Sequence, residues 1–289
     1  MMLDEIKGQY GNMSKGQKKV ADFISNNVER AAFMTATKLA EAAGVSESTV
    51  VRFATLLGYD GFPEFQNAMA EELQSRLVSP KKAQTNQFRE NRSELLRKVM
   101  VADAQNIVDT LGMLNGEAFE NAVQLLRDAR RVWIVGIRTC APLAQYLAYY
   151  LHMMRDEVQC VTTSNISEIY EQLSWMQKED VMVAISFPRY SMRTLKAMDF
   201  ANRKSVRLIA VTDSKYSPMN MYSSCNLWTK TDMITMVDSL VAPMSMLNAL
   251  VVGFYLQDEE RISARLETME ELWDEFQIYD RDEMSDLGE

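Results

Sequence analysis

The chain has 289 residues, more than one hydrophobic core usually holds, so two domains are expected. A composition of 47% hydrophobic and 25% charged residues is typical of a soluble globular protein and excludes a fibrous or disordered chain. Three cysteines without ligand spacing, and an acidic start without a signal-peptide pattern, favour a reduced cytoplasmic protein. The most apolar run, residues 240–256, is interrupted by a proline, a serine and an asparagine, and predicts a buried helix, not a membrane span.

The net charge of −9 is gathered at the carboxyl end. Residues 258–289 carry 13 acidic and 3 basic side chains, whereas residues 1–82 carry ten of each sign. If the amino-terminal part binds DNA, its attraction for phosphate depends on local basic side chains, namely Lys15, Lys18, Lys19, Lys38 and Arg52. Because non-specific binding by such a module is weak, we expect dimerisation to be needed for DNA binding.

The amino-terminal part predicts five helices, roughly over residues 3–10, 15–26, 36–43, 47–56 and 62–77. The third and fourth are joined by a tight turn, in which Gly44 can adopt a left-handed backbone and Ser46 can cap the next helix. The pair has the form of a helix-turn-helix, whose second helix enters the DNA major groove. The residues predicted to contact DNA are Lys38, Ser46, Glu47, Ser48, Thr49 and Arg52.

An ordinary helical hairpin explains a bare pattern of this kind equally well. Here, however, GVSESTVVRF (residues 44–53) is followed at fixed spacing by LGYDGFPEF (residues 57–65). Upstream, SKGQKKVADFI (residues 14–24) precedes two asparagines. Together these segments resemble the amino-terminal domain of the RpiR family of bacterial transcription regulators. The resemblance implies an all-α, helix-turn-helix DNA-binding domain over residues 1–77.

A polar stretch over residues 78–90, with a proline and few apolar side chains, predicts a linker. Helices are expected over residues 91–111, 117–129 and 142–153, and short apolar runs over 132–136, 158–161, 181–185 and 206–211. This alternation predicts an α/β domain over residues 91–276, a doubly wound parallel sheet with flanking helices. The apolar stripe of residues 262–276 predicts an amphipathic helix docked on the core or on a second subunit, followed by an acidic tail, residues 277–289.

Ligands of such sheets bind at the carboxyl ends of the strands. The loops there read GIRTCAP (residues 136–142) and ISFPRYSMRT (residues 185–194). Neither has a dinucleotide or ATP fingerprint, and neither a cofactor nor a metal is expected. Hydroxyls, guanidinium groups and helix amino termini suit a compact phosphate, although polar caps of helix ends are the plainer interpretation. The predicted ligand-binding residues are Arg138, Thr139, Cys140, Ser186, Arg189, Tyr190, Ser191, Arg193 and Thr194.

From about residue 131 to 254 the chain resembles a sugar isomerase (SIS) domain, the usual partner of the RpiR domain. In that family, glycine- and serine-rich loops after two strands bind phosphosugars. By position, Thr139 and Cys140 fall on the serine pair of the first loop, and Ser186, Pro188 and Ser191 on the hydroxyl series of the second. The chain departs from the family where Arg138 and Arg189 replace common glycines and where Cys140 and Pro188 replace hydroxyls.

Three functions compete. The first is a transcription regulator of carbohydrate metabolism genes that binds a double-stranded DNA operator as a homodimer or homotetramer and senses a phosphorylated sugar. The second is a phosphosugar isomerase with an accessory helix-turn-helix domain, and the third is a helical adaptor. An isomerase needs a base, and the candidates are weak: His152 lies in an apolar helix, and a solvated helix face explains Glu168 and Glu171. No catalytic residue is therefore predicted, and the regulator is favoured.

Overall fold

Residues 2–69 form a helical domain in the computed structural model, which describes residues 2–69, 92–233 and 237–279. Its elements are α1 (Met2–Gln9), the 3-10 turn η1 (Tyr10–Asn12), α2 (Lys15–Asn26), α3 (Val28–Ala31), α4 (Ala36–Ala43), α5 (Glu47–Leu56) and a helix described over residues 62–69. The predicted bounds of α2, α4 and α5 are confirmed. The short helix α3 was not predicted, because a single turn produces no periodic pattern. The predicted linker, residues 78–90, lies outside the described residues.

Local signals fix the ends of these helices. At the start of α2, the Gln17 amide N–H donates to Ser14 Oγ, while the Ser14 N–H donates to Gln17 Oε1 at 2.9 Å, a reciprocal capping box. At the end of α4, Gly44 has a φ of 64°, and the Val45 N–H reaches back to the Ala40 carbonyl at 2.9 Å. Only glycine adopts this left-handed backbone without strain, so the turn between α4 and α5 is set by Gly44.

The core of the helical domain is aromatic. Phe53 and Phe65 are fully buried and meet edge to face, with ring centroids 5.6 Å apart. Val50, Phe53 and Ala54 form the buried side of α5, as the apolar stripe predicted, and the opposite side of α5 stays exposed.

The second domain is built on a five-stranded, fully parallel sheet of order β2-β1-β3-β4-β5. The strands are β1 (Val132–Gly136), β2 (Val158–Val161), β3 (Val181–Ile185), β4 (Arg207–Thr212) and β5 (Cys225–Trp228). The predicted bounds of β1, β2 and β3 are confirmed, and β4 begins one residue later than predicted. The fifth strand was not predicted, because its four residues include a buried cysteine and a half-buried asparagine in place of an apolar run.

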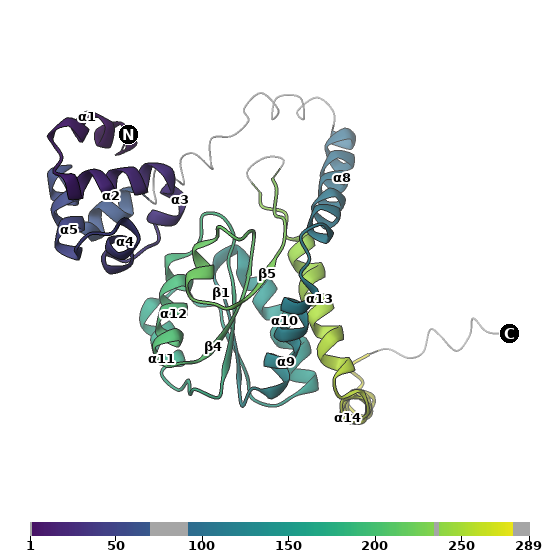
Figure 1. The fold of residues 1–289 in the computed structure, drawn as a ribbon. Helices are drawn as coiled ribbons and strands as arrows, with labels where there is room; N and C mark the ends of the chain where they lie inside the picture. The colour runs from purple at the N-terminus through teal and green to yellow at the C-terminus, as the bar shows by residue number, and fades with distance from the viewer. Residues whose placement is uncertain (1, 70–91, 234–236, 280–289) are drawn as a thin grey trace.

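Helices cover both faces of the sheet (Figure 1). One face packs on α11 (Ile166–Leu173) and α12 (Met192–Arg203), and the other on α9 (Gly116–Asp128), α10 (Ala141–Met154) and α13 (Val241–Leu256). Short 3-10 turns η2 (Arg138–Cys140) and η3 (Pro218–Met221) follow β1 and β4. The central strands β1, β3 and β4 are thus buried on both faces, which explains why they read as continuous apolar runs.

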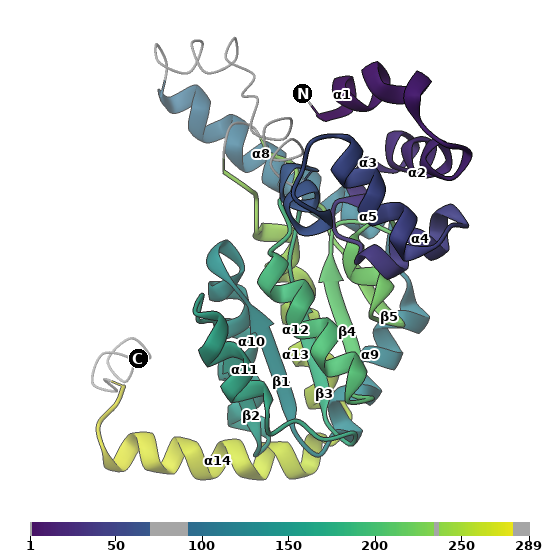
Figure 2. The same cartoon turned by 90° about the vertical axis from the view of Figure 1, so that its left-hand side faces the viewer.

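The strand order decides where a ligand can bind. Because β1 pairs with both β2 and β3, the chain reverses direction across the sheet at β1, and the loops after β1 and β3 lie side by side. Figure 2 shows the carboxyl ends of the strands facing the helical domain, while α14 (Glu259–Glu275) crosses the opposite end of the sheet.

Two helices expose apolar side chains. The first, α8 (Arg92–Leu111), packs against α13 but leaves large apolar residues in solvent, namely Leu96, Val99, Met100, Val101, Val108 and Leu111. On α14 the predicted stripe is only partly docked, since Ile262 is buried in the core and Phe276 is 67% exposed. Within the described residues no helix is long and apolar enough to cross a membrane.

A buried carboxylate joins β1 to β3 at their amino ends. Asp180 has no exposed surface and accepts hydrogen bonds from the Trp133 indole N–H at 3.0 Å and from the Gln177 amide at 2.9 Å. The Arg130 guanidinium lies 2.8 Å from the same carboxylate. The hydrogen bonds all reach Oδ2 and, with the ion pair to Arg130, offset part of the cost of burying the charge.

Replacing Asp180 by alanine should lower the free energy of unfolding by about 3 kcal/mol, because it leaves a buried indole N–H and a guanidinium without their acceptor. Urea unfolding followed by circular dichroism measures the change. The exposed Asp128, which bonds only to the Gln124 side chain, supplies the control, and Asp128→Ala should cost less than about 0.5 kcal/mol. Equal losses in the two variants would contradict this role of Asp180.

Candidate functional site

The first candidate surface is the outer side of the α4–α5 pair. Ser46, Glu47, Ser48 and Arg52 are exposed there, and Thr49 is half-buried. The Arg52 Nε donates to the Ser48 carbonyl at 3.2 Å, which lays the guanidinium along the first turns of α5. A cation and small hydroxyls therefore share one exposed helix face, as contact with phosphates and base edges requires.

Ser46 was expected to cap α5 through its side chain. It occupies the N-cap position with an extended backbone, but its hydroxyl makes no hydrogen bond to the helix backbone. Instead the Ser46 Oγ lies 2.9 Å from both the Ser48 and the Thr49 hydroxyls. Glu47 accepts a hydrogen bond from the Thr37 hydroxyl at 2.8 Å, which ties the start of α5 to α4. The three hydroxyls thus bond to one another, and the charged groups on this face are the Arg52 guanidinium and the Glu47 carboxylate.

Lys38 is placed differently from the other five predicted DNA contacts. It is half-buried, and its Nζ lies 3.9 Å from the centroid of the Tyr222 ring, which belongs to the α/β domain. Burial lowers the pKa of the Lys38 ammonium, while the nearby Asp199 carboxylate raises it. In this arrangement Lys38 binds the second domain of its own chain.

The second candidate site is a cavity of about 180 Å³, here called the loop pocket, between the loops after β1 and β3. It is lined by Ile137, Arg138, Thr139, Cys140, Ser186, Phe187, Pro188, Arg189, Ser191 and Asp238. Six of the nine predicted ligand-binding residues are therefore brought together. Tyr190, Arg193 and Thr194 are not among the residues that line the pocket. Tyr190 and Arg193 are half-buried and exposed, respectively, and Thr194 is fully buried.

Gly136 at the end of β1 allows the first loop to form. A Cβ at this position would lie 2.5 Å from the Cys140 carbonyl oxygen and 2.8 Å from the Ala144 Cβ, closer than packed atoms approach. The absence of a side chain lets η2 and the first turn of α10 sit directly on the strand end. The amino terminus of α10 is thereby held beside the pocket, where its dipole favours an anion.

Arginines occupy strained positions in both loops. Arg138 has a φ of 61° and Arg189 a φ of 66°, the left-handed region in which a residue with a Cβ costs about 1–2 kcal/mol. Both are positions at which the resemblance to SIS domains led us to expect a glycine. Their backbone has a conformation that suits glycine, while their side chains add a guanidinium to each wall of the pocket.

Hydroxyls organise the second loop. Ser186 Oγ accepts a hydrogen bond from the Ser191 N–H at 3.2 Å, and Ser191 Oγ accepts one from the Thr194 N–H at 3.4 Å, capping α12. Both hydroxyls keep an O–H to donate, because a serine that accepts still has its proton. They therefore cap the loop, as the plainer interpretation holds, and remain able to donate to a ligand oxygen.

Asp238 is the pocket residue that sequence reasoning missed. It enters from the segment before α13, and its carboxylate lies 3.8 Å from the Arg189 guanidinium. Burial raises the pKa of Asp238, and Arg189 partly offsets this effect. No motif surrounds it, and some fifty residues separate it from the second loop, so only the folded structure reveals it.

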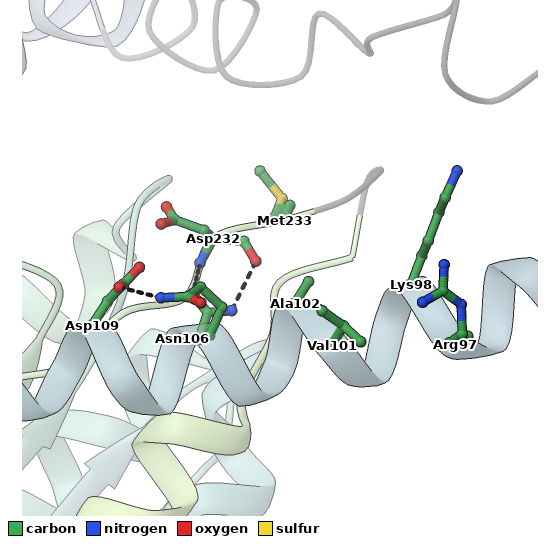
Figure 3. Close-up of a pocket in the computed structure, with 9 residues that line it drawn as sticks. Arg97, Lys98, Val101, Ala102, Asn106, Asp109, Asp232 and Met233 are labelled. Atoms are coloured by element: carbon green, nitrogen blue, oxygen red, sulfur yellow. Dashed lines mark hydrogen bonds between the residues drawn. The ribbon is translucent and has the colours of Figure 1, made fainter.

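The position of Asp238 depends on α8. The buried Asn106 side chain forms two hydrogen bonds of 3.1 Å with the backbone of Asp232, beside a groove of about 390 Å³ (Figure 3). Ser239 donates to the Asp103 carboxylate at 2.6 Å, and the Lys230 N–H donates to the Thr110 hydroxyl at 2.9 Å. The segment that carries Asp238 is thus fastened along α8, the helix that follows the helical domain in sequence.

Cys140 cannot serve as a nucleophile in its present surroundings. The side chain is 5% exposed, and burial raises the pKa of the thiol to about 11. The thiol is therefore neutral near pH 7, whereas nucleophilic attack requires the thiolate. Cys140 contributes a small, weakly polar wall to the pocket.

Comparison with known proteins identifies both domains. The family models of the rpiR-family helix-turn-helix domain and of the SIS domain match residues 1–76 and 125–253. The transcriptional regulator YfhH of Escherichia coli K12 is 28% identical over 78% of this chain and 80% of its own. The sugar isomerase domain of an RpiR transcription factor from Sphaerobacter thermophilus is 26% identical, with a TM-score of 0.59, over 62% of this chain and 99% of that one. The Vibrio vulnificus NanR protein, complexed with ManNAc-6P, has a TM-score of 0.62 and 20% identity over 93% of this chain and 97% of its own.

Arg52→Ala should weaken binding to a duplex that carries the upstream region of the protein's own gene. Because one phosphate contact is lost, the plot of log affinity against log salt concentration should also become less steep, by about one unit of slope. Fluorescence anisotropy over a salt series measures both quantities. Lys178→Ala removes an exposed cation from the opposite end of the α/β domain and should change neither. An unchanged affinity and slope in Arg52→Ala would move the DNA-binding surface elsewhere.

Arg189→Gly and Arg189→Ala should differ in stability although both remove the guanidinium. Glycine relieves the strain at a φ of 66° and alanine does not, so the glycine variant should be about 1 kcal/mol more stable than the alanine variant. Thermal unfolding compares the stability of the two variants. The affinity of the loop pocket for sulfate, used as a probe for an anion, should fall equally in both, because both lack the guanidinium. If the alanine variant were the more stable, the strain would be absent in solution.

Proposed function

Because the chain belongs to the rpiR family of helix-turn-helix transcriptional regulators that carry a SIS domain, we propose that its loop pocket senses a phosphorylated sugar or a related small anion. Binding in the pocket would then control how the helical domain engages operator DNA upstream of carbohydrate metabolism genes.

One observation carries the proposal. Two loops from neighbouring strands place a guanidinium each, Arg138 and Arg189, around a cavity that also receives the Ser186 hydroxyl and the amino ends of α10 and α12. Guanidinium forks, hydroxyl donors and helix amino termini are the groups that hold a compact phosphate. Asp238 adds an acceptor on the same wall, which suits the hydroxyls of a sugar.

NanR, which shares the fold of this chain, is known in complex with ManNAc-6P. At 20% identity that complex supports the class of ligand and not its identity. The arginines at positions 138 and 189 make this pocket narrower and more basic than a glycine-rich loop would be, so a different sugar phosphate is expected here.

A homodimer or homotetramer is part of the proposal. Residues 1–82 carry no net charge, so one copy of the helical domain attracts DNA weakly, and two copies can address two half-sites. The exposed apolar side chains of α8 and the exposed end of α14 offer surface for pairing of the α/β domains.

A sugar-phosphate isomerase is less well supported. An aldose–ketose isomerisation needs a base poised near neutral pH beside the substrate. His152 lies in the last turn of α10, about 18 Å along the helix from the pocket end, and it is exposed. Glu168 accepts hydrogen bonds from Thr163 and Asn165 in the first turn of α11. Neither residue lines the loop pocket, so we propose that the protein binds its ligand without turning it over.

A panel of sugar phosphates, screened by thermal shift and confirmed by calorimetry on the full chain, tests the ligand class. Every ligand that binds is then incubated with the protein and analysed for isomerised product. Binding without product supports the regulator. Conversion of a bound sugar phosphate at enzymatic rates would overturn it, and the absence of any binding in the panel would remove the sensing role.

Two variants should move anion affinity in opposite directions. Ser186→Ala removes a donor and the anchor of the Ser191 N–H, and should weaken sugar-phosphate binding about tenfold or more. Asp238→Asn removes a carboxylate that competes for Arg189, and should strengthen sulfate binding, measured by calorimetry.

Because the pKa of Asp238 is raised, the affinity of the wild type for sulfate should also rise as pH falls towards that pKa, and this rise should vanish in Asp238→Asn. The exposed Ser167→Ala is the control, and a weaker sulfate affinity in Asp238→Asn would contradict the assignment.

A further inference from the structure

The helical domain and the α/β domain of one chain share a packed interface beside the loop pocket. Phe33, in the segment between α3 and α4, is only 6% exposed, and its ring meets the Tyr190 ring edge to face, with centroids 5.4 Å apart. Phe33 belongs to an apolar cluster that runs from the helical domain into the α/β domain, and Tyr190 packs against this cluster. Figure 2 shows the helical domain above the carboxyl ends of the strands, and Figure 1 shows it displaced to the side of the sheet on which α12 lies.

A cation–π contact forms the second part of the interface. The Lys38 ammonium lies 3.9 Å from the centroid of the Tyr222 ring, within the range of an attractive interaction. Tyr222 is 9% exposed, and burial raises the pKa of its phenol to about 12, so the ring stays neutral. The Asp199 carboxylate on α12 favours the charged form of the same lysine. Tyr190, Asp199 and Tyr222 together are called the docking surface below.

Tyr190 belongs to both the interface and the ligand loop. It stands between Arg189 and Ser191, which line the loop pocket, while its own ring turns away to Phe33. Its hydroxyl donates to Asp213 at 2.6 Å, in the loop after β4. Any change of backbone at Arg189, which is held at a φ of 66°, therefore moves the root of the side chain that contacts the helical domain.

The interface is incompletely packed, as a reversible contact requires. A cavity of about 670 Å³ remains between the end of α2 (Ser25, Asn26 and Asn27) and the segment around η3 (Lys215 and Asn220). Polar groups line much of this cavity, so separating the domains exposes little additional apolar surface there. The ring contact at Phe33 and the cation–π contact at Lys38 both cross this interface.

From these contacts we propose that the docking surface holds the helical domain in a state that competes with DNA binding, and that Tyr190 couples this state to the loop pocket. In the docked state the Lys38 ammonium is engaged by Tyr222 and is withdrawn from the phosphate backbone, which the first helix of a helix-turn-helix crosses. An anion that draws Arg189 away from Asp238 changes the loop on which Tyr190 stands. The coupling part rests on the proposed sensing function, whereas the docking part does not.

The docking itself is tested on the full chain by hydroxyl-radical footprinting without any ligand. Phe33 and Tyr222 should be labelled far more slowly than Tyr216, which is 69% exposed in the same domain as Tyr222. Tyr190→Ala should accelerate labelling of Phe33. Tyr190→Phe keeps the ring and should retain the protection. Labelling of Phe33 and Tyr222 in the wild type at the rate of Tyr216 would overturn the proposal.

Competition with DNA is tested by affinity for a duplex of arbitrary sequence at low salt. Loss of an edge-to-face pair shifts an equilibrium by a factor of about 2–12, so Tyr190→Ala should bind the duplex more tightly by up to that factor. Tyr222→Leu should act in the same direction, since it frees Lys38. Tyr149→Ala, which removes an exposed tyrosine of α10 that lines neither the cavity at the domain interface nor the loop pocket, is the matched control and should bind as the wild type does. Unchanged affinity in both interface variants, with their thermal unfolding intact, would overturn the competition.

The coupling is tested with inorganic phosphate as the probe. Saturating phosphate should change the labelling rate of Phe33 in the wild type and leave it unchanged in Tyr190→Ala. If calorimetry shows phosphate binding while Phe33 labelling stays constant, the coupling through Tyr190 is wrong although sensing stands. If no phosphate or sugar phosphate binds, the sensing function fails and the coupling with it, while the footprint and the duplex affinities still decide the docking.

Discussion

The pairing of β1 with β3 is the constraint on which the rest of the structure depends. At the amino ends of these strands, buried Asp180 fastens the pair through Trp133 and Arg130. At their carboxyl ends, Gly136 lets α10 approach so closely that a single added carbon would collide with the Cys140 carbonyl. Two loops that are fifty residues apart in sequence are thereby brought to one edge, where they share a cavity. The sheet order alone brings the two arginines to the same site.

Much of this architecture was predictable because its signals are local. Strands buried on both faces read as short apolar runs, so β1 and β3 and the loops after them could be located without a structure. Gly44 and the stripe of Val50 and Phe53 likewise marked the turn and the buried side of α5. The short elements α3 and β5 were not predicted from the sequence, because four residues of mixed polarity show no periodic pattern. The place of Asp238 in the pocket and the contacts of Lys38 and Tyr190 were not predicted for another reason. Each of them depends on a partner residue that is distant in the sequence.

The loop arginines illustrate how a fold tolerates a local cost. The left-handed backbone at positions 138 and 189 is imposed by the loop geometry, and a residue with a side chain bears strain there. The sequence nevertheless carries arginine at both, which adds positive charge to a cavity that would otherwise have only hydroxyls and backbone amides. Asp238 balances part of that charge, so the pocket presents both donors and an acceptor.

The amide clamp between Asn106 and the Asp232 backbone has a consequence for how the two domains respond to their medium. Both of its hydrogen bonds join uncharged groups that lie partly buried, and dissolved ions screen such bonds very little. The affinity of a protein for DNA, by contrast, falls steeply as the salt concentration rises. Added salt should therefore weaken any binding to DNA, while the wall of the pocket held by α8 keeps its shape. The shape of this wall is thus set independently of ionic strength, even though the affinity of the loop pocket for a charged ligand is not.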